Sequence, residues 1–489
     1  MSRVSDIYRP SLSTLTDLYE LTMAAGYEAA GVADREAVFS LSFRSLPFGG
    51  GYALAAGLDD ALEILGRMRF ESEDIEHLRS LRGSGDNPLF RPDFLERLAA
   101  FKFNGDVDAI PEGTVVFANE PLVRIRGPLV QAQLVESMLL TVVGFQTLVA
   151  TKAARIVEAA GGGSILEFGL RRAQGPDGAL SAARAAYIGG VAATSNVLAG
   201  RLYGIPVRGT HAHSWVQVFD DEQRAFDAYA DAQPDNVTLL VDTYDSLAGV
   251  GHAIETGRRL RAGGGTLAAI RLDSGDLAYL SIEARRMLDE AGFEDTKIVA
   301  SNDLDEYTIA SLREQGARID TWGVGTRLDT CFDQPALGAV YKLTAICEPG
   351  GWRYPIKLSE HSAKISIPGV LGVRRFVDAS GRFRADMIYD EDLPDAADAH
   401  VIVDPADALH MRAIDPSWSA QEILAPAMRS GRRVRPAPTL DETRTRARDQ
   451  VGSLHPAIRR LLNPHTYPVG LEMRLHERRS ALVLEHRRV

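Results

Sequence analysis

The sequence contains few cysteines and no long hydrophobic run. Its two cysteines, Cys331 and Cys347, cannot form a disulfide framework or a CxxC metal site. The longest uncharged stretches, between Glu136 and Lys152 and between Arg184 and Arg201, fall short of the roughly 20 apolar residues that cross a bilayer. The N-terminal MSRVSDIYRP has no apolar signal core. We therefore expect a soluble, cytoplasmic protein without a membrane partner.

Lysine is also scarce, and positive charge does not predominate. Only six of the 54 basic residues are lysine, and the net charge is -12. This balance excludes a general nucleic-acid binder, which needs a basic face. Arginine must supply most cationic recognition, and its fork suits carboxylate and phosphate groups. With 45% apolar and 25% charged residues over 489 positions, the chain is a globular protein of two or three domains.

The first part of the chain, residues 1–135, mixes helix and strand. Thr14 and Asp17 have capping-box spacing ahead of TDLYELTMAAGY, which predicts a helix. AVFSLSF is typical of a strand, and PEGTVVFANEPLVRIRG of short strands around turns. We interpret this region as an N-terminal α+β domain.

Between residues 136 and 345 the pattern becomes strand, polar loop and helix, repeated. This alternation predicts parallel strands joined by helices, in a closed barrel or an open doubly wound sheet. A helix over 277–291, ended by Gly292, follows the fourth strand. The expected strands are 163–169, 205–209, 237–242, 267–272, 297–301 and 319–325.

Polar residues come directly after each of these strands. They are Arg171, Arg172, Thr210, His213, Asp242, Tyr244, Asp273, Asp276, Asn302, Asp303, Gly325 and Thr326. Barrel enzymes build their active sites at the carboxyl ends of the strands. The pattern therefore favours an α/β barrel with its catalytic site at that face.

The last part, residues 346–489, is less regular. SIPGVLGVRRF suggests strands that return in part to the N-terminal domain, and RSGRRVRPAP (429–438) has the composition of a linker or extended arm. Its positive charges are more typical of a solvated segment than of a nucleic-acid site.

The loop RLDSGD (271–276) combines groups that suit a sugar phosphate. Main-chain N–H groups at a helix start favour anions. Asp273 and Asp276 can bind ribose hydroxyls or Mg²⁺. The alternative is a plain helix cap by Asp273 or Ser274. GVGT (323–326) is a second candidate phosphate loop.

GTHAHSWV (209–216) places two histidines beyond a strand. Each can act as a base, a metal ligand, a phosphate acceptor or a structural residue. A zinc pair of His211 and His213 lacks HExxH spacing and a cysteine partner. The chain has no P-loop and no GxGxxG after a strand, which disfavours common modes of ATP or NAD binding, and Ser214 is not in a GxSxG elbow.

Taken together, eight segments resemble nicotinate phosphoribosyltransferase. They are TDLYELTM, FGLRRAQG, GTHAHS, RLDSGDL, SNDLDE, GVGTRL, PALGAVYKL and NPHTYPVGL, in this order over nearly the whole chain. The resemblance implies an enzyme that joins nicotinate to phosphoribosyl pyrophosphate, giving nicotinate mononucleotide and pyrophosphate with ATP hydrolysis and Mg²⁺. This reaction begins NAD synthesis from nicotinate.

The resemblance also implies a fold and a set of site residues. The fold is an irregular α/β barrel of the type II phosphoribosyltransferases with a second domain from both chain ends, in a homodimer with shared sites. By motif, Tyr19 reaches the partner's site and Phe168 stacks on the pyridine. Arg271 and Thr210 contact nicotinate. The remaining assignments are Arg171 for phosphate, Asp273, Ser274 and Asp276 for ribose and magnesium, Gly325 and Thr326 for the 5′-phosphate, and His213, rather than His211, for phosphorylation by ATP.

Alternative functions stay open on these residues alone. The enzyme could instead prefer nicotinamide or quinolinate, or the chain could be a catalytically inactive barrel that binds nucleotides. The presence of Arg171, His213, Asp273 and Asp276 together argues against the inactive barrel.

Overall fold

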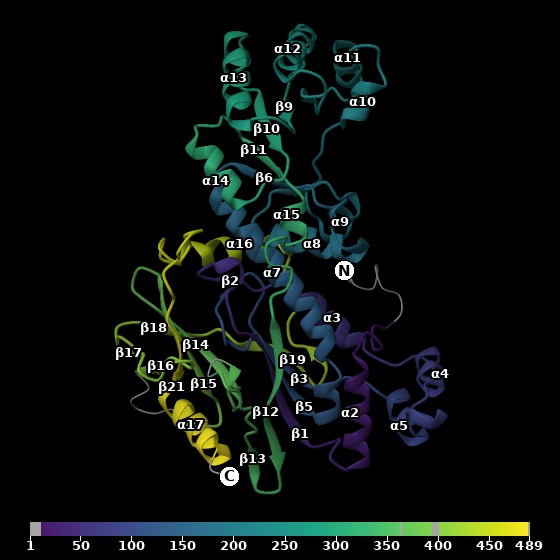
Figure 1. The fold of residues 1–489 in the computed structure, drawn as a ribbon, viewed down its shortest axis with the longest axis vertical. Helices are drawn as coiled ribbons and strands as arrows, with labels where there is room; N and C mark the ends of the chain where they lie inside the picture. Colours follow the sequence, from purple (N-terminus) through teal and green to yellow (C-terminus); the bar gives the residue numbers. More distant parts are fainter. Residues whose placement is uncertain (1–10, 362–363, 394–400, 488–489) are drawn as a thin grey trace. The chain divides into compact units, whose positions relative to one another are not determined.

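The computed structural model describes residues 11–361, 364–393 and 401–487. The segment without a signal core, residues 1–10, lies outside them. The chain forms two compact units: unit 1 is Met1–Thr151 with Ala336–Val489, and unit 2 is Lys152–Pro335 (Figure 1). The sequence pattern changes near residues 135 and 345, whereas the units divide inside α7 (Glu136–Ala160) and ahead of β12 (Ala339–Glu348).

Unit 1 contains an antiparallel sheet built from both parts of its chain. β1 (Glu36–Phe43) pairs with β12 on one side and with β5 (Val123–Pro128) on the other. The order continues through β3 (Asp106–Ala109) to β19 (Ala425–Arg429) and β20 (Arg432–Arg433), and β13 (Gly351–Arg353) extends the far edge. Strands 300 residues apart in sequence thus share one sheet, which local sequence patterns cannot reveal.

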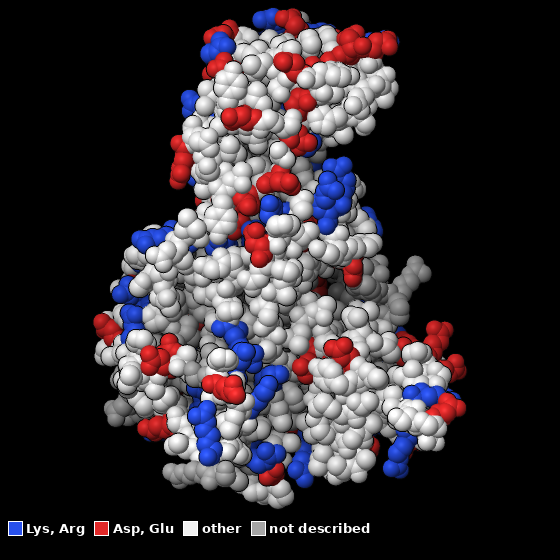
Figure 2. All heavy atoms as spheres, viewed as in Figure 1, with Lys and Arg blue, Asp and Glu red and all other residues white. Residues whose placement is uncertain are grey.

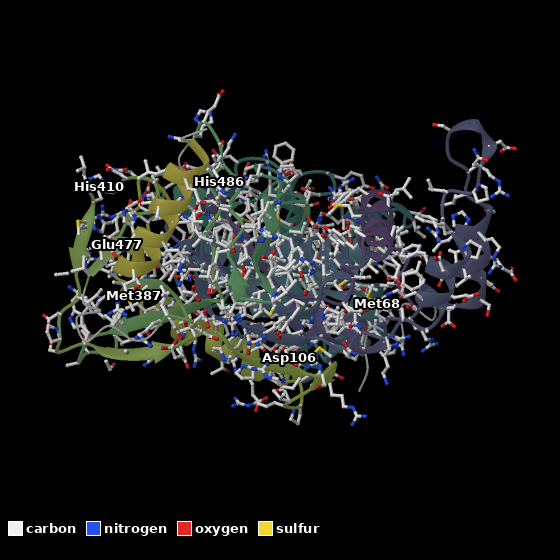
Figure 3. All side chains as sticks on the ribbon, turned by 90° about the horizontal axis from the view of Figure 1, so that it is seen from below. Met68, Asp106, Met387, His410, Glu477 and His486 are labelled. Atoms are coloured by element: carbon white, nitrogen blue, oxygen red, sulfur yellow. The ribbon has the colours of Figure 1, made fainter. Side chains whose placement is uncertain are left out.

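A second sheet in unit 1 contains β14 (Leu371–Val377), β15 (Phe383–Asp390) and β21 (Val469–Glu472), with shorter strands at its edges. β14 begins within the strand-like SIPGVLGVRRF segment and ends one residue beyond it. Met387 of β15 is 1% exposed and packs with Phe376 and Ile402. Figure 3 shows Met387 among packed side chains and His410 at the periphery.

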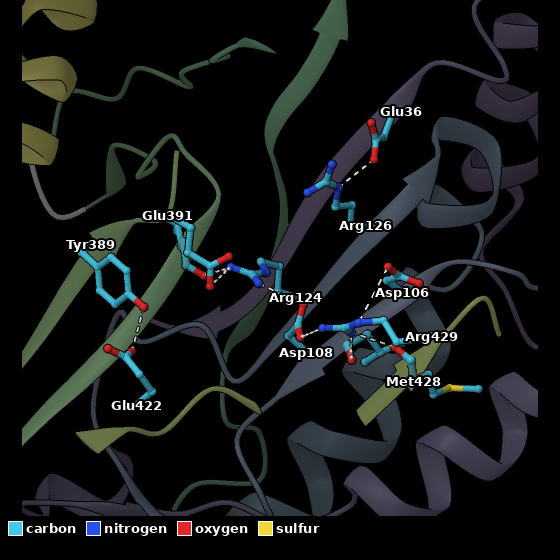
Figure 4. Close-up of polar contacts among 12 residues, drawn as sticks. Glu36, Asp106, Asp108, Arg124, Arg126, Tyr389, Glu391, Glu422, Met428 and Arg429 are labelled. Carbon is cyan, nitrogen blue, oxygen red and sulfur yellow. Dashed lines mark hydrogen bonds and ion pairs between the residues drawn. The ribbon is translucent and has the colours of Figure 1, made fainter. Parts of the chain in front are cut away.

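The interpretation of residues 429–438 as a linker or arm is wrong for the first part of this stretch, because β19 and β20 form a hairpin at the sheet edge. Arg429 donates to Asp108 at 2.6 Å and Arg433 to Asp59 at 2.8 Å. Figure 4 shows Arg429 and Arg124 on either side of Asp108. Arg429 and Arg433 are thus paired with carboxylates of unit 1, which composition alone does not reveal.

Unit 2 is built on a parallel six-stranded sheet in the order β7-β6-β11-β10-β9-β8. The strands are β6 (Ser164–Glu167), β7 (Ala193–Thr194), β8 (Thr238–Leu240), β9 (Ala269–Leu272), β10 (Lys297–Ser301) and β11 (Thr321–Val324). β6, the first of the series, pairs with β11, the last. The chain is therefore mixed α/β, as expected, while closure into a barrel stays a prediction.

One expected strand of unit 2 is wrong. Residues 205–209 form no named strand but a single bridge from Val207 to Thr194. Pro206 has no N–H group to donate to a ladder, so the pairing stops after one bridge. The polar residue expected at this strand end, Thr210, still follows directly in the chain.

Helix ends agree in part with expectation. α13 (Leu277–Glu290) follows β9 as predicted, and Gly292, at φ +80°, comes just after it. α2 (Leu18–Ala29) also forms, but the capping box predicted for Thr14 and Asp17 does not: the Asp17 side chain makes no cap bond, and the Thr14 hydroxyl donates to Asp74.

The stretch Leu129–Ala160, comprising α6 (Leu129–Gln133) and α7, is long and apolar enough to cross a membrane by length and composition. However, 67% of its most apolar window is buried inside the structure. Such burial is typical of a core helix, since a core helix and a membrane span pass the same composition test.

Candidate active site

Arg271, at the end of β9, is the centre of a polar network in unit 2. Its Nε donates to Ser301 Oγ at 2.8 Å, Nη1 to Thr210 Oγ1 at 2.9 Å and Nη2 to Asp273 Oδ1 at 3.0 Å. A guanidinium has five N–H donors in a planar fork. Because three are used, one N–H on each terminal nitrogen remains available for a bound group.

Phe168 lies beside this arginine. The Arg271 guanidinium carbon is 5.5 Å from the centre of the Phe168 ring. A Cβ on Gly323 of β11 would come within 2.6 Å of the ring, so the absence of a side chain there lets the ring lie close to the strand. The structure therefore groups an aromatic surface, a cation and the Thr210 hydroxyl, three of the predicted nicotinate contacts.

Asp273 connects Arg271 to His213. One carboxylate oxygen of Asp273 accepts from Arg271 and from the Ser301 hydroxyl. The other lies 3.7 Å from His213 Nε2. His213 begins α10 (His213–Gln217), and its Nδ1 lies 3.2 Å from Thr243 Oγ1. The side chain is 39% exposed, so Nε2 is accessible beside a carboxylate.

His211, the neighbouring histidine, lies in a different environment. It is buried, its Nε2 accepts the Leu240 N–H at 3.1 Å, and its Nδ1 lies 3.3 Å from the Ala212 carbonyl. It also packs edge-on against Tyr229. Burial lowers the pKa of His211 to about 4, so the ring is neutral with both nitrogens engaged in the protein.

The 273–276 loop is held by the strand beside it. Asp242, just after β8, accepts from the Asp273 N–H at 2.9 Å and from the Ser274 hydroxyl at 2.6 Å. Asp276, rather than Asp273 or Ser274, caps α13, because one of its oxygens accepts from the N–H groups of Ala278 and Tyr279. Ser274 and Asp276 are exposed.

The other predicted phosphate contacts lie at the ends of β6 and β11. Gly325 lies against Phe168, since a Cβ on Gly325 would be 3.0 Å from the Phe168 carbonyl oxygen. Thr326 begins α15 (Thr326–Asp329) and is partly exposed. Arg171 is exposed and forms no ion pair with a described residue, which leaves its guanidinium available to an anion.

Tyr19 lies apart from this group in sequence and belongs to unit 1. It is on α2, and 44% of it is exposed. Burial and the neighbouring carboxylate of Glu136 raise the pKa of its hydroxyl. Within the described residues 11–135 it is one of four exposed large apolar or aromatic side chains, together with Leu15, Leu18 and Met23.

Three family models match the chain in sequence order. The N-terminal domain model of nicotinate phosphoribosyltransferase matches residues 14–144, the nicotinate phosphoribosyltransferase family model 164–357, and the C-terminal domain model 372–479. A nicotinate phosphoribosyltransferase of Bacillus subtilis is 44% identical, with 96% of this chain and 97% of that protein covered. The chain belongs to the nicotinate phosphoribosyltransferase family.

Further relatives and a solved structure agree. A nicotinate phosphoribosyltransferase of Mycobacterium tuberculosis is 44% identical over 94% of this chain and 91% of its own length. The crystal structure of human nicotinic acid phosphoribosyltransferase matches with a TM-score of 0.83 and 34% identity, covering 96% of this chain and 99% of that one. A nicotinate-nucleotide pyrophosphorylase from Pyrococcus furiosus, at 21% identity and a TM-score of 0.69, shares the fold.

In this nicotinate phosphoribosyltransferase family member, the site contains three residues that were not predicted as site residues. Ser301 bridges Arg271 and Asp273, Asp242 holds the 273–274 backbone, and Thr243 contacts His213. All three lie at the carboxyl end of a parallel strand. The pattern that indicated Asp273 applies equally to Asp242 and Thr243, and it noted Asp242 without a role, whereas Ser301 lies inside the expected strand 297–301.

Unit 1 holds a second polar feature that was not predicted, a basic pocket with a cavity volume of about 50 Å³. Four cationic side chains line it, three of them among the six lysines of the chain: Arg44, Lys342, Lys357 and Lys364. Burial and the charges of Lys357 and Arg44 lower the pKa of Lys342, although Glu136 opposes this. Figure 2 shows basic side chains gathered over the region of β12. Such a pocket favours an anion.

Proposed function

We propose that this enzyme couples ATP hydrolysis, through a phosphohistidine at His213, to phosphoribosyl transfer onto nicotinate. As a member of its family it uses nicotinate and phosphoribosyl pyrophosphate and serves NAD synthesis from nicotinate. The observation that supports the proposal most directly is the Arg271 network, in which a cation with spare donors lies beside an aromatic ring and a hydroxyl. We place the reaction in the cytoplasm.

The Arg271 network accounts for a preference for acid over amide. Two free N–H groups on one planar fork suit a carboxylate, which accepts two parallel hydrogen bonds. A carboxamide presents one oxygen and one NH₂, and that NH₂ would face a donor. The Phe168 ring offers a flat surface on which a pyridine can stack. This arrangement favours nicotinate over nicotinamide.

Displacement of pyrophosphate from C1 of ribose passes through an oxocarbenium-like state. It therefore requires positioning and charge neutralisation more than acid or base catalysis. Asp273, Ser274 and Asp276 are available to ribose hydroxyls, and Arg171, Gly325 and Thr326 to phosphates. An irregular barrel, with β7 and β8 at its unpaired edges, would bring these strand ends to one face.

The carboxylates of the site suit Mg²⁺, which prefers oxygen ligands and usually takes one or two carboxylates plus substrate phosphates. Among the described residues no three His, Cys, Asp or Glu side chains cluster as a ready metal cage. One buried oxygen of Asp242 has no hydrogen-bond partner, and one oxygen of Asp276 does not cap α13. Mg²⁺ arriving with pyrophosphate or ATP would neutralise their charge, and Asp242 and Asp276 are the residues that could hold it.

His213 is better placed than His211 to accept a phosphoryl group. The Nε2 atom of His213 is accessible, whereas both nitrogens of His211 are engaged. Asp273 beside Nε2 can orient the ring and stabilise its positive form, as a carboxylate does for a histidine in proton transfer. The phosphorylated ring would then act by its charge on the pyrophosphate and its metal.

We propose a homodimer in which Tyr19 reaches the partner's site. The exposed apolar side chains of α2 supply a surface that a second copy can cover. The basic pocket of unit 1 would then serve the polyphosphate part of phosphoribosyl pyrophosphate or ATP. Mixing Tyr19→Ala chains with His213→Ala chains, which lack the ATP-stimulated activity, should restore part of that activity in heterodimers. No recovery after proven subunit exchange would contradict the shared site.

The test of the proposed function is nicotinate mononucleotide formation with and without ATP, together with labelling by γ-³²P-ATP. We expect ATP to raise product formation and to leave an acid-labile, alkali-stable label. The label and the ATP effect should disappear in His213→Ala, which retains slow uncoupled synthesis, and persist in His211→Gln. A label that disappears with His211 and survives the loss of His213 would contradict the assignment.

A further inference from the structure

Two carboxyl groups are buried together beneath the loop that carries Phe168 and Arg171. Glu167, the last residue of β6, is 1% exposed, and Asp329, the last residue of α15, is 0% exposed. Asp329 lowers the pKa of Glu167, whereas Glu167 raises the pKa of Asp329, as expected when one carboxyl donates a hydrogen bond to the other. Two negative charges cannot share such a site, so one proton lies between them.

Hydrogen bonding shows which of the two keeps the proton. The Glu167 carboxylate accepts from the Gly169 N–H, the Leu170 N–H and the Thr194 hydroxyl, besides Asp329. Four donors match the roughly four acceptor sites of an ionised carboxylate. Neither oxygen of Asp329 accepts a hydrogen bond from a described residue. An ionised Asp329 would leave two buried oxygens unpaired, so Asp329 is the protonated partner.

The pair also shapes the backbone of the loop. A Cβ at Gly169 would come within 2.1 Å of the Asp329 carboxyl carbon, so the carboxyl packs directly on the backbone between Phe168 and Leu170. The Phe168 N–H donates to the Val324 carbonyl at 2.8 Å. The loop is therefore fixed by β11 on one side and by the acid pair beneath it.

No described basic side chain lowers the pKa of Asp329. Burial raises the pKa of both carboxyls, and Glu167 raises that of Asp329 further. Asp177 and Arg184 on α8 (Gly175–Ile188), which packs against α15, and Arg327 on α15 itself are the other charged residues of these two helices. None of the three shifts the pKa of Asp329. In unit 1, by contrast, the buried pair of Glu120 and Asp386 is accompanied by Arg375.

We propose that Glu167 and Asp329 are a proton-sharing positioning pair that holds the 168–172 loop in the geometry in which Phe168 and Arg171 receive the substrates. The inference rests on the proposed roles of Phe168 and Arg171. The proton stays on Asp329 and is donated to Glu167, and no bond of the substrates is made or broken by the pair. Loss of the proton at alkaline pH would put a second charge under the loop and loosen it.

Three variants test the pair. Asp329→Asn keeps a donor toward Glu167 without a titrating proton, and Asp329→Leu has similar size but no donor. Glu120→Gln, which replaces a buried carboxyl of unit 1 whose pKa is also raised by burial, is a matched control. Hydrogen exchange of the 168–172 amides is measured in the ligand-free enzyme over a range of pH, with each variant compared with wild type at the same pH, and steady-state kinetics follow for the same proteins.

In wild type we expect loop protection to fall as pH rises, and in Asp329→Asn to stay constant. Asp329→Leu should exchange about tenfold faster at every pH and raise the KM for nicotinate about tenfold with kcat within about threefold, since one hydrogen bond to a charged group is lost. Its melting temperature should not fall, because a desolvated carboxyl is removed. Glu120→Gln should match wild type in both the protection of the loop and the KM.

The same pH dependence of loop exchange in wild type and Asp329→Asn would overturn the proposal. This comparison tests the proposal even if Asp329→Leu does not fold. Unchanged KM and loop exchange in a folded Asp329→Leu would overturn it as well. The exchange measurement uses no substrate, so it stands apart from the proposed function. That function fails separately if wild type makes no nicotinate mononucleotide.

Discussion

Two arginine–aspartate networks, one in each unit, differ in how completely their groups are paired. In unit 1, Arg375 is 1% exposed and bonds both oxygens of Asp386, the Val115 carbonyl and Gln450. Its guanidinium also lies 4.5 Å from the centre of the Phe383 ring. In unit 2, Arg271 is 15% exposed on its side chain and leaves two donors unused.

The difference distinguishes a charged side chain that stabilises the fold from one that is available to bind a ligand. A buried charge is tolerated only when its hydrogen bonds are met within the protein, and Arg375 meets that condition at every nitrogen. Arg271 is held in place by three bonds yet keeps donors on the open side, as expected of a preorganised binding group. Both arginines lie inside strands that are otherwise largely apolar, β9 and β14, so only their surroundings distinguish them.

The largest expected effect is on stability in unit 1. Arg375→Leu should lower the free energy of unfolding by about 3–5 kcal/mol, since it leaves Asp386 buried without its cation. The neighbouring Arg374→Leu, which removes an ion pair with the half-exposed Glu422, should cost less than about 1 kcal/mol. Urea unfolding measures both. Equal losses would contradict the structural reading of Arg375.

His211 should make stability depend on acid pH. Its folded pKa of about 4 lies below the unfolded value of about 6.5, so the unfolded chain binds the proton first. This contribution is fully present above pH 6.5 and falls by roughly 3 kcal/mol as pH drops to 4. Urea unfolding at several pH values should show a shallower dependence in His211→Gln, whose amide oxygen can accept the Leu240 N–H. Parallel curves for the two proteins would contradict a buried neutral His211.

In unit 2 the comparison predicts loss of function rather than loss of fold. Arg271→Gln should lower kcat/KM for nicotinate by about 100-fold, because the carboxylate loses a charged, hydrogen-bonded partner. The melting temperature should change little. Arg286→Gln, on the exposed face of α13, serves as the control for the loss of one arginine. An unchanged KM for nicotinate in folded Arg271→Gln would count against the assigned contact.

The smallest expected effect concerns the basic pocket. Lys357→Ala should weaken binding of pyrophosphate by about two- to fivefold at low salt, because the other cations of the pocket still attract the anion. The difference should be smaller at high salt, because salt screens these charges. Lys102→Ala, an exposed lysine outside the pocket, should bind pyrophosphate as wild type does. Isothermal titration at two salt concentrations measures this. If both variants changed the affinity for pyrophosphate equally, the proposed role of the pocket in binding would be contradicted.

Much of unit 2 could be predicted because its signals are local. β6, β8, β9, β10 and β11 lie within the expected segments, and Thr210, Arg271 and Asp273 follow from the rule that sites gather at strand ends. Pro206 shows the limit, since a strand-like composition could not form a ladder without the proline N–H. Ser301 was hidden inside a strand segment, where nothing indicates that its hydroxyl faces a site.

Unit 1 was harder to predict because its contacts are distant in sequence. The partners of Arg375 come from β4 (Val115–Val116), β15 and α16 (Leu440–Gly452). The basic pocket combines Arg44 with Lys342, Lys357 and Lys364. No short motif contains these groups, so a single sequence does not bring them together. For the same reason, the hairpin at 429–433 was mistaken for a linker.

The most direct test of the account is the ratio of kcat/KM for nicotinate to that for nicotinamide, measured with phosphoribosyl pyrophosphate for wild type and Arg271→Gln. If Arg271 selects the acid through its two free donors, wild type should prefer nicotinate by at least about 100-fold, and the variant should lose most of that preference. A wild type that prefers nicotinamide, or a variant that keeps the full preference for nicotinate, would contradict the central claim.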